Sequence, residues 1–461
     1  MAGKVKKGFG AYMFILLLAV VAAFLIVMVV MICNPFKNIL GFQYVYYKGT
    51  EDFTNVRGGD PGTIFDLTSL DEIRVNCNYA EVVIERDFDA GSNKIVVDNF
   101  IAGFAPESAD VDYSVGIYYK AGSNNKILCI DVDEPECSVF FGKRVVVSIQ
   151  LPKYSTKDFS NTKINISNTS GNVSIGYGDN NAEKMNIKEL DIKTTSGKIS
   201  FGGIVGTKMN NIFIKNETGS VETGDLEVGN FTFITNSGNA KFHNLKATNS
   251  CSLQIGDGTF YASKLIGDAS VQIKNGYLDI DSVVGDINGN NAAEQMQGAT
   301  ITIKEVSGNV SFPFVNNARI TINKITNGKL YARGTTGLVN VSDMRGYAWV
   351  EMTTGSVSLH SNQAFEIVTS SGKIDASISA SSISKEVIIQ SEKGEINLGL
   401  NNGLGCNINA MFADGTVRNT NNVTIEGIQN PVFPVQLNSG GTNINLTTDS
   451  KISVYVLSDA A

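Results

Sequence analysis

The stretch Leu-Asp-Ile-Lys-Thr-Thr-Ser-Gly-Lys-Ile-Ser-Phe, residues 190–201, decides how this chain folds. Apolar residues alternate with polar ones on both sides of Gly197, at seven and five residues before it and at two and four residues after it. A period of two places alternate side chains on one side of a β-strand. Glycine among small polar residues is typical of a tight corner that needs a positive φ. The stretch therefore predicts two short strands joined by a corner.

The same arrangement recurs around twelve glycines, at an average interval of about 22 residues, which is typical of solenoid coils. Eleven units carry apolar residues at both positions before the glycine, and all twelve carry one at two residues after it. The exception is Gly328, where the two apolar residues, Ile320 and Ile322, lie one residue further from the glycine than in the other units. We expect each glycine to supply a positive φ. The repeat glycines are Gly171, Gly197, Gly219, Gly238, Gly258, Gly276, Gly308, Gly328, Gly355, Gly372, Gly394 and Gly415.

A series of ordinary β-hairpins is the alternative interpretation, since Asn-Gly and Ser-Gly also form hairpin turns. Two features favour a solenoid: the offsets are constant, and the same inward position is filled by Ile, Phe, Val or Leu from unit to unit. Stacked coils favour this repetition, because each inward side chain packs on the equivalent side chain of the next coil, about 4.8 Å away along the axis. We therefore predict an all-β fold containing a β-solenoid of about 12 coils, with a rod length of about 60 Å.

The N-terminus predicts a membrane anchor. Lys4, Lys6 and Lys7 precede an uncharged apolar stretch at 11–33, which is long enough to cross a hydrocarbon core of about 30 Å as a helix. A cleaved signal peptide has a shorter apolar core, followed by small residues. The lysines favour a cytoplasmic N-terminus. We expect a single-pass protein of the cell membrane with its C-terminal part extracytoplasmic.

Composition divides the rest of the chain. A polar insertion at 288–297 and an excursion at 177–185 leave the repeat as loops, and such loops often form a binding face. The predicted regions are a cytoplasmic N-terminus (1–10), a transmembrane helix (11–33), a juxtamembrane connector (34–70), a β-sandwich-like cap domain (71–155), the β-solenoid (156–420) and a C-terminal cap (421–461).

The net charge of the chain limits the classes of partner that it can bind. The first 34 residues hold three of the 37 basic residues and no acidic ones, so the remainder has 34 basic against 45 acidic residues and a net charge of −11. An acidic ectodomain argues against binding nucleic acid or an anionic polymer through net charge. Contacts with proteins remain compatible with this charge.

The cysteines are placed mainly as small hydrophobic residues. Cys77, Cys251 and Cys406 each occupy an inward strand position. Cys129 and Cys137, on either side of an acidic turn, are spaced like a hairpin disulfide, although two free thiols remain an alternative.

The sequence offers little catalytic chemistry. His243 and His360 both fall one residue past an inward position, so we expect them to point to solvent on separate coils. Catalytic triads and zinc sites need converging partners, and neither histidine has candidates nearby. We therefore predict no catalytic, cofactor-binding or metal residues. A weak Ca²⁺ candidate is the acidic turn, for which a solvated turn is the simpler interpretation. Its carboxylates are Asp131, Asp133, Glu134 and Glu136.

A family resemblance rests on the junction before the first coil. The stretch Arg-Val-Val-Val-Ser-Ile-Gln-Leu-Pro (144–152) is followed by Lys-Ile-Asn-Ile-Ser-Asn-Thr-Ser-Gly-Asn-Val-Ser-Ile (163–175). Over roughly residues 70–455, the chain resembles a bacterial family of adhesin-like β-strand-repeat proteins of unknown function. The resemblance implies a surface β-solenoid with no established chemistry, often anchored by one N-terminal helix and in some members encoded beside envelope stress systems.

Three functions are compatible with these features. The first is a membrane-anchored extracytoplasmic solenoid with a structural, adhesive or binding role towards a surface polymer or protein. The second is a sensor of envelope stress that regulates a neighbouring membrane signalling protein. The third is a polysaccharide-active enzyme of the β-helix type, which needs acidic and basic residues clustered on one face. We expect a non-enzymatic protein, because the charged residues are scattered over different coils.

Overall fold

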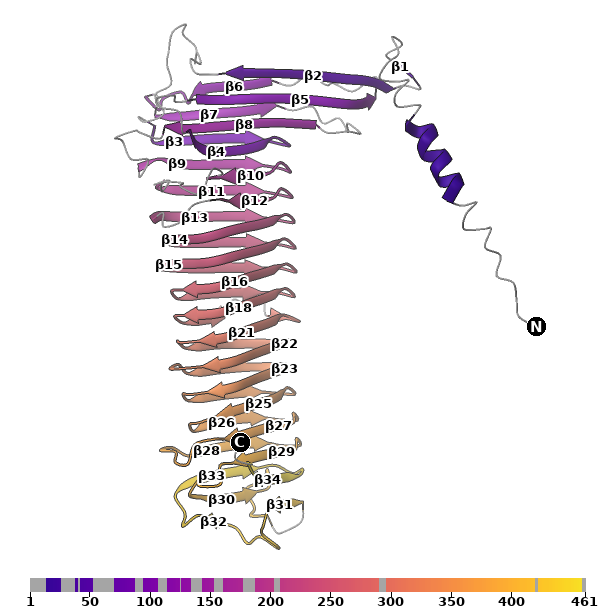
Figure 1. The fold of residues 1–461 in the computed structure, drawn as a ribbon. Coiled ribbons are helices and arrows are strands. Elements are labelled where there is room, and N and C mark those ends of the chain that lie inside the picture. Colours follow the sequence, from indigo (N-terminus) through magenta and orange to yellow (C-terminus); the bar gives the residue numbers. More distant parts are fainter. Residues whose placement is uncertain are drawn as a thin grey trace, which may run out of the picture.

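The computed structural model describes residues 14–25, 38–39, 42–52, 70–87, 94–106, 114–124, 126–133, 143–152, 161–176, 187–202, 208–289, 296–418 and 422–457. Apart from a helix at 14–25, the described elements are strands (Figure 1). The N-terminal strands are β1 (Asn38–Ile39), β2 (Phe42–Asp52), β3 (Glu72–Cys77), β4 (Glu81–Asp87), β5 (Lys94–Pro106), β6 (Ser114–Tyr119), β7 (Ile127–Asp133) and β8 (Lys143–Pro152). The next strands are β9 (Lys163–Asn168), β10 (Val173–Ile175), β11 (Glu189–Thr194), β12 (Ile199–Phe201), β13 (Lys208–Asn216), β14 (Ser220–Thr235), β15 (Asn239–Ile255), β16 (Thr259–Ile266), β17 (Ala269–Ile273), β18 (Tyr277–Val284), β19 (Ile287–Gly289), β20 (Met296–Gln297) and β21 (Thr300–Val306). The remaining strands are β22 (Val310–Ile325), β23 (Leu330–Met344), β24 (Ala348–Met352), β25 (Ser356–Ser361), β26 (Phe365–Thr369), β27 (Ile374–Ile378), β28 (Val387–Ser391), β29 (Ile396–Leu400), β30 (Cys406–Met411), β31 (Val423–Ile425), β32 (Val435–Leu437), β33 (Thr442–Thr447) and β34 (Ile452–Val456).

The strands form a β-solenoid, as predicted. Successive coils pair in parallel along two long ladders, and a short ladder such as Asp225–Val228 with Asn244–Ala247 continues the pairing around the corner between them, so all strands belong to one continuous sheet (Figure 1). The pairing is in register: Leu190 is aligned with Ile164 of the preceding coil and Ile212 of the following one. We call the ladder containing β9, β11, β17, β24, β26 and β28 sheet I, and the ladder containing β10, β12, β16, β18, β25, β27 and β29 sheet II. The long strands β14, β15, β22 and β23 bend around a corner and belong to both.

The core lies between the sheets and consists of the predicted inward side chains. Ile192 and Ile199 are fully buried, whereas their polar neighbours Asp191 and Ser200 are partly exposed. Aromatic rings meet across the core: Phe231 of sheet I lies 5.3 Å from Phe242 of sheet II, and Phe242 stacks on Phe260 at 5.1 Å. Stacking of like residues along the axis therefore makes one continuous core.

The reason for glycine at the corners differs from the prediction. Of the twelve repeat glycines, only Gly415 has a positive φ (84°). The others are required because adjacent coils approach closely at the corner. A Cβ atom on Gly197 would lie 1.9 Å from the carbonyl oxygen of Gly171, and one on Gly372 would lie 1.7 Å from that of Gly355. Any side chain at these positions would push two backbones apart.

The buried corner also carries a polar residue three positions before the glycine. The side chains of Asn168, Thr194, Asn216, Thr235 and Ser391 each accept a hydrogen bond from the backbone N–H of the glycine that follows. All five are buried, so each satisfies a donor that water cannot reach. This position was not predicted from the sequence, although it can be found there as the Asn, Thr or Ser of N-x-x-G, T-x-x-G and S-x-x-G.

This contact makes a prediction for Thr235. Its hydroxyl accepts the Gly238 N–H at 2.8 Å, and replacement by the nearly isosteric valine leaves that donor buried and unpaired. We expect Thr235→Val to lower the free energy of unfolding by about 1–3 kcal/mol, measured by urea denaturation. Thr235→Ser keeps the hydroxyl and should lose less. Equal stability of the valine variant and the native chain would contradict the role of this bond.

The solenoid has two columns of corners, which explains two irregularities of the repeat. Gly276 lies where the chain passes from sheet I to sheet II, whereas Gly308 and Gly328 lie where it passes from sheet II back to sheet I. These two glycines therefore belong to a different column of corners from Gly276, although they share the sequence pattern. The 32-residue gap before Gly308 and the nine-residue spacing from Gly328 to Gly337 reflect a switch between columns. Apart from the shift of one residue before Gly328, either corner produces the same apolar offsets.

The first stacked coil begins earlier than predicted. Strands β3 and β4 pair in parallel with β9 and β10, so stacking starts at residue 72 and not after residue 155. On their other side, β3 and β4 pair in parallel with β7 and β8, which follow them in the chain. The antiparallel strands β6, β5 and β2 then extend the two sheets beyond β7 and β8. The predicted separate cap domain is therefore a continuation of the solenoid, and residues 42–52, predicted as connector, form β2.

The C-terminal end uses the same arrangement. Strands β33 and β34 are inserted between β28/β29 and the earlier strands β30/β31, with parallel pairing on both sides. Stacking therefore continues past the predicted boundary at residue 420. Gly415 lies in a hairpin turn, where Val417 is 65% exposed and not in an inward position. Its assignment as a coil glycine was wrong, because a matching sequence offset arose from a turn.

The predicted transmembrane segment is only partly described. Residues 14–25 are helical and all of their side chains are exposed. Among the helical residues that the structure describes, none forms a helix with the length and apolar character needed to span a bilayer. Residues 11–13 and 26–33 of the predicted segment lie outside the described residues.

Candidate functional site

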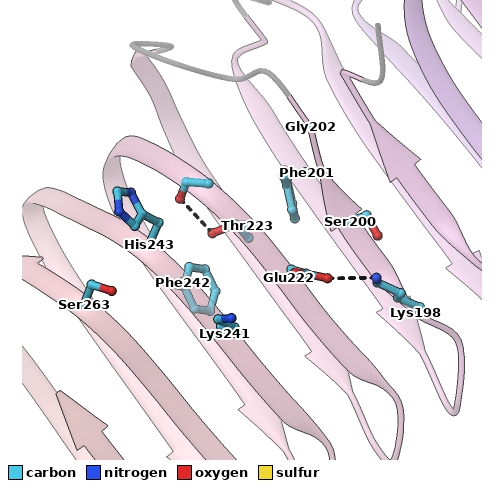
Figure 2. Close-up of a pocket in the computed structure, with 11 residues that line it drawn as sticks. Lys198, Ser200, Phe201, Gly202, Glu222, Thr223, Lys241, Phe242, His243 and Ser263 are labelled. Carbon is cyan, nitrogen blue, oxygen red and sulfur yellow. Dashed lines mark hydrogen bonds and ion pairs between the residues drawn. The ribbon is translucent and has the colours of Figure 1, made fainter. Parts of the chain in front are cut away.

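A groove on the outer surface of sheet II is the candidate site (Figure 2). It consists of two adjoining depressions of about 450 and 650 Å³ that share Lys198, Glu222 and Lys241. We call it the sheet II groove. Its lining residues are Lys198, Ser200, Phe201, Gly202, Ser220, Val221, Glu222, Thr223, Gly224, Asn239, Ala240, Lys241, Phe242, His243, Thr259, Tyr261 and Ser263.

The alternation of each strand produces the groove. Phe201 and Phe242 turn inward to the core, so their neighbours in sequence point outward. Register places Glu222 beside Lys241 and Lys241 beside Tyr261 on adjacent coils. The outward positions around this row hold small residues, and at Gly224 a Cβ atom would have no neighbour within 4 Å. A row of long side chains among short ones therefore leaves hollows on both sides.

The charges in the groove are held by an ion pair. Lys198 Nζ donates to Glu222 Oε2 at 2.8 Å, as Figure 2 shows. This hydrogen bond, the charge of Lys198 and the nearby charge of Lys241 lower the pKa of the Glu222 carboxyl. Glu222 is therefore ionised at neutral pH. Two ammonium groups and one carboxylate make this row locally positive on an acidic chain.

The histidines lie where the sequence placed them, on separate coils. His243 points to solvent, with its Nδ1 2.6 Å from Asp225 Oδ1 and its side chain 65% exposed. His360 is part-buried, and its Nδ1 contacts the Ser377 hydroxyl. They belong to β15 and β25 and do not converge. In the groove, His243 adds a hydrogen-bonding ring at the rim.

The candidate calcium turn is only partly described. Asp131 accepts hydrogen bonds from Asn76 Nδ2 at 2.6 Å and from the Tyr118 hydroxyl at 2.5 Å. The bond to Asp131 raises the pKa of Tyr118 to about 12. Asp133 is exposed at the end of β7, and Glu134 and Glu136 lie outside the described residues. In the described part of the chain, no three His, Cys, Asp or Glu side chains converge as metal ligands.

The inward cysteines have the predicted environment. Cys77, Cys251 and Cys406 are all buried. Burial raises the pKa of Cys251 to about 12 and that of Cys406 to about 11, so both are unreactive near neutral pH. Cys129 is a buried free thiol, and Cys137 lies outside the described residues.

None of the residues that line the groove belongs to the predicted binding loops. Residues 177–185 and 290–295 lie outside the described residues, so the loops remain a prediction. The groove was not predicted from the sequence, because it forms only when the outward residues of several coils are aligned. Glu222, Lys241 and Tyr261 each stand three residues after a corner glycine, so aligning the coils on their glycines would have placed them in one row.

Comparison with known proteins identifies the family. No curated protein matches the chain. A solved structure from Clostridium sporogenes ATCC 15579, described as a "putative cell adhesion protein", shares 9% sequence identity and covers 89% of this chain and 99% of its own, with a TM-score of 0.16. A family model described as Toastrack DUF4097 matches residues 71–328, which is more than half of the 461 residues. The chain therefore belongs to the Toastrack DUF4097 family.

Proposed function

We propose that this chain is a membrane-anchored extracytoplasmic β-solenoid with a structural, adhesive or binding role at the cell surface, and that the sheet II groove is its contact surface. The observation that carries the proposal is the charged group formed by Lys198, Glu222 and Lys241 on three adjacent coils, in which Glu222 is aligned with Lys241 and ion-paired with Lys198. Parallel pairing fixes these side chains relative to one another. A surface ordered in advance loses little conformational entropy when it binds.

The chemistry of the groove favours an extended polar partner. Ser200, Ser220 and Asn239 offer short hydrogen-bonding groups beside the charged row, and Tyr261 adds an aromatic ring. A polymer or peptide that carries hydroxyl and carboxylate groups matches this lining. The only carboxylate among the lining residues is the ion-paired Glu222, which lacks the raised pKa of a general acid. We therefore propose binding without catalysis, and no nucleic-acid partner.

The membrane anchor is supported by the N-terminal segment. The apolar run at 11–33 has the length of a bilayer span and follows three lysines. Within it, the helix at 14–25 exposes large apolar side chains, among them Phe14 (63%) and Leu16 (62%). Exposed apolar residues on all sides of a helix suit lipid surroundings. The part of the chain after the anchor is then extracytoplasmic.

A regulatory function is the second candidate, and the β2–β5 ladder favours it. These two strands pair over eleven residue pairs from Phe42 to Asp52 and extend past the edge of the stacked coils (Figure 1). Because β2 follows the anchor segment by a few residues, the ladder would lie near the membrane. A stiff ladder in that place suits contact with a neighbouring membrane signalling protein, as in a sensor of envelope stress.

The groove is tested by charge reversal. We expect the full-length Lys198→Glu/Lys241→Glu variant to lose at least about fivefold in capture of its surface partner, because two contacts of about 0.5–1 kcal/mol are reversed. The measurement is in-cell crosslinking followed by affinity purification and mass spectrometry. Lys304→Glu/Lys324→Glu is the matched control, since both lysines also form ion pairs on sheet II. If both variants captured the surface partner equally well, the sheet II groove would be excluded as the contact surface.

Replacing the anchor separates the two functions. A chain carrying an unrelated transmembrane helix in place of 11–33 should keep its surface contacts if it is an adhesin or spacer. Loss of one specific membrane partner on that exchange, with the groove intact, would favour regulation.

A further inference from the structure

A second surface, on sheet I, has the features of a ligand site. We propose that a depression between β17 and β23 binds an uncharged pyranose ring of a glycan. The depression has a volume of about 740 Å³, within the usual range of about 300–1,000 Å³ for small-ligand sites. It lies on the sheet opposite to the sheet II groove, and the proposal does not depend on that groove being a contact surface.

The floor of the depression is short and polar. Parallel pairing aligns Ser270 with Asn288 and Asn288 with Ser311, so three small outward side chains follow one another on consecutive coils. All three line the depression. Two intervals between coils give a floor about 10 Å long, which is the length of one or two sugar rings. Hydroxyl and amide groups on this floor can both donate and accept hydrogen bonds.

An aromatic wall closes one end of this floor. The column continues from Ser311 to Tyr331 and then to Trp349, the only tryptophan of the chain. The two rings are parallel within 8°, with centroids 4.7 Å apart. Trp349 covers one face of the Tyr331 ring, so the other face is turned towards Ser311 and the depression. The stack holds the tyrosine ring in place before any ligand arrives.

The rim supplies charged groups whose charges cancel. Arg333 lines the depression, and its Nε lies 3.3 Å from a carboxylate oxygen of Glu351. Such a pair can donate to and accept from hydroxyl groups. It does not favour a net charge on the ligand, because an anion drawn to Arg333 also meets Glu351. Phe314, 43% exposed, adds an apolar side wall.

These features together match a pyranose ring. One face of such a ring consists of C–H groups, which pack on the electron-rich face of an aromatic ring. Its edge carries hydroxyl groups, which suit the polar floor and the charged rim. A purely apolar ligand would leave Asn288 and Ser311 without partners, at a cost in binding free energy. A small ion would make no use of Tyr331.

The experiment uses the full-length chain and defined glycans. The chain is screened on an array of neutral and acidic glycans, and cellotetraose, chitotetraose, maltotetraose and tetragalacturonate are titrated by calorimetry and by the fluorescence of Trp349. We expect at least one neutral glycan to bind and to change the Trp349 emission. Tyr331→Ala should weaken that binding at least about tenfold, since an aromatic stacking contact is removed. Tyr331→Phe keeps the ring and should bind nearly as well.

Two further variants separate loss of the site from loss of the fold. Ser311→Phe fills the floor while leaving Tyr331 and Trp349 in place, and it should also abolish binding. Tyr277→Ala removes an exposed tyrosine of β18 that lines neither the depression nor the sheet II groove, and it should leave glycan binding unchanged. The urea midpoint of each variant shows whether it is folded.

Three results would overturn the proposal: capture of no neutral glycan by the full-length chain, tighter binding of tetragalacturonate than of every neutral glycan, or undiminished binding by folded Tyr331→Ala and Ser311→Phe chains. The Lys198→Glu/Lys241→Glu variant should still bind the glycan. A failure of the groove proposal and a failure of this one are therefore distinguishable.

Discussion

Gly372→Ala is expected to lower the free energy of unfolding by about 3 kcal/mol or more, at the upper end of the cost of overpacking a core. The added Cβ would lie 1.7 Å from the carbonyl oxygen of Gly355. That oxygen belongs to the backbone of the preceding coil, so no rotation of a side chain can relieve the collision. Separating the two coils would break hydrogen bonds between β25 and β27. Thermal and urea denaturation, followed by circular dichroism, measure the effect.

Gly224→Ala is the matched control for this substitution. A Cβ atom at Gly224 meets nothing within 4 Å, and the residue does not have a positive φ. We expect a change within about 0.5 kcal/mol. Similar losses for both variants would show that the corner glycines are needed for backbone conformation and not for the close approach of coils.

Phe242→Ala is expected to cost about 3–5 kcal/mol, which is typical of removing a buried phenylalanine. Phe242 is fully buried and contacts the rings of Phe231, Phe233 and Phe260, which come from both sheets. The substitution therefore opens a cavity between the rings of two adjacent coils. Because each coil of a solenoid contacts only its neighbours, limited proteolysis should cut first near these coils.

Lys241→Ala provides the comparison on the other side of the same strand. Lys241 precedes Phe242 and points outward into the sheet II groove. Its loss should change stability by no more than about 0.5 kcal/mol. A loss as large as that of Phe242→Ala would contradict the assignment of inward and outward faces.

The coil could be predicted from the sequence because it is a local unit. Alternation around residues such as Leu190 and Ile192 determines which side chains are buried, and the glycine marks the corner. The reason for the glycine could not be predicted in this way. A positive φ and a close approach to another backbone both select glycine, and only the position of Gly355 relative to Gly372 distinguishes them.

The ends of the solenoid and the surface sites depend on contacts between distant residues. Nothing local in β33 indicates that it pairs with β28 on one side and β30 on the other. The stacking of Tyr331 on Trp349 likewise requires the register between two coils, although the residues are 18 positions apart in the sequence. Aligning the coils on their corner glycines recovers the row of Glu222, Lys241 and Tyr261. This alignment of coils fails where the repeated pattern passes from glycines of one corner column to glycines of the other.

The insertion of β3/β4 and of β33/β34 between neighbouring coils has a consequence for how such a chain can lengthen. At the first end β3 lies between β7 and β9, and at the other end β33 lies between β28 and β30, so the order of strands in space differs from their order in the chain. Inserting a coil at either end would therefore disrupt existing strand pairs. The coils between β9 and β29 follow one another in simple order. Tandem duplication of a gene segment that encodes one of these coils would lengthen the rod and leave both ends intact. We therefore expect relatives of different length to differ in the number of middle coils and not in the two ends.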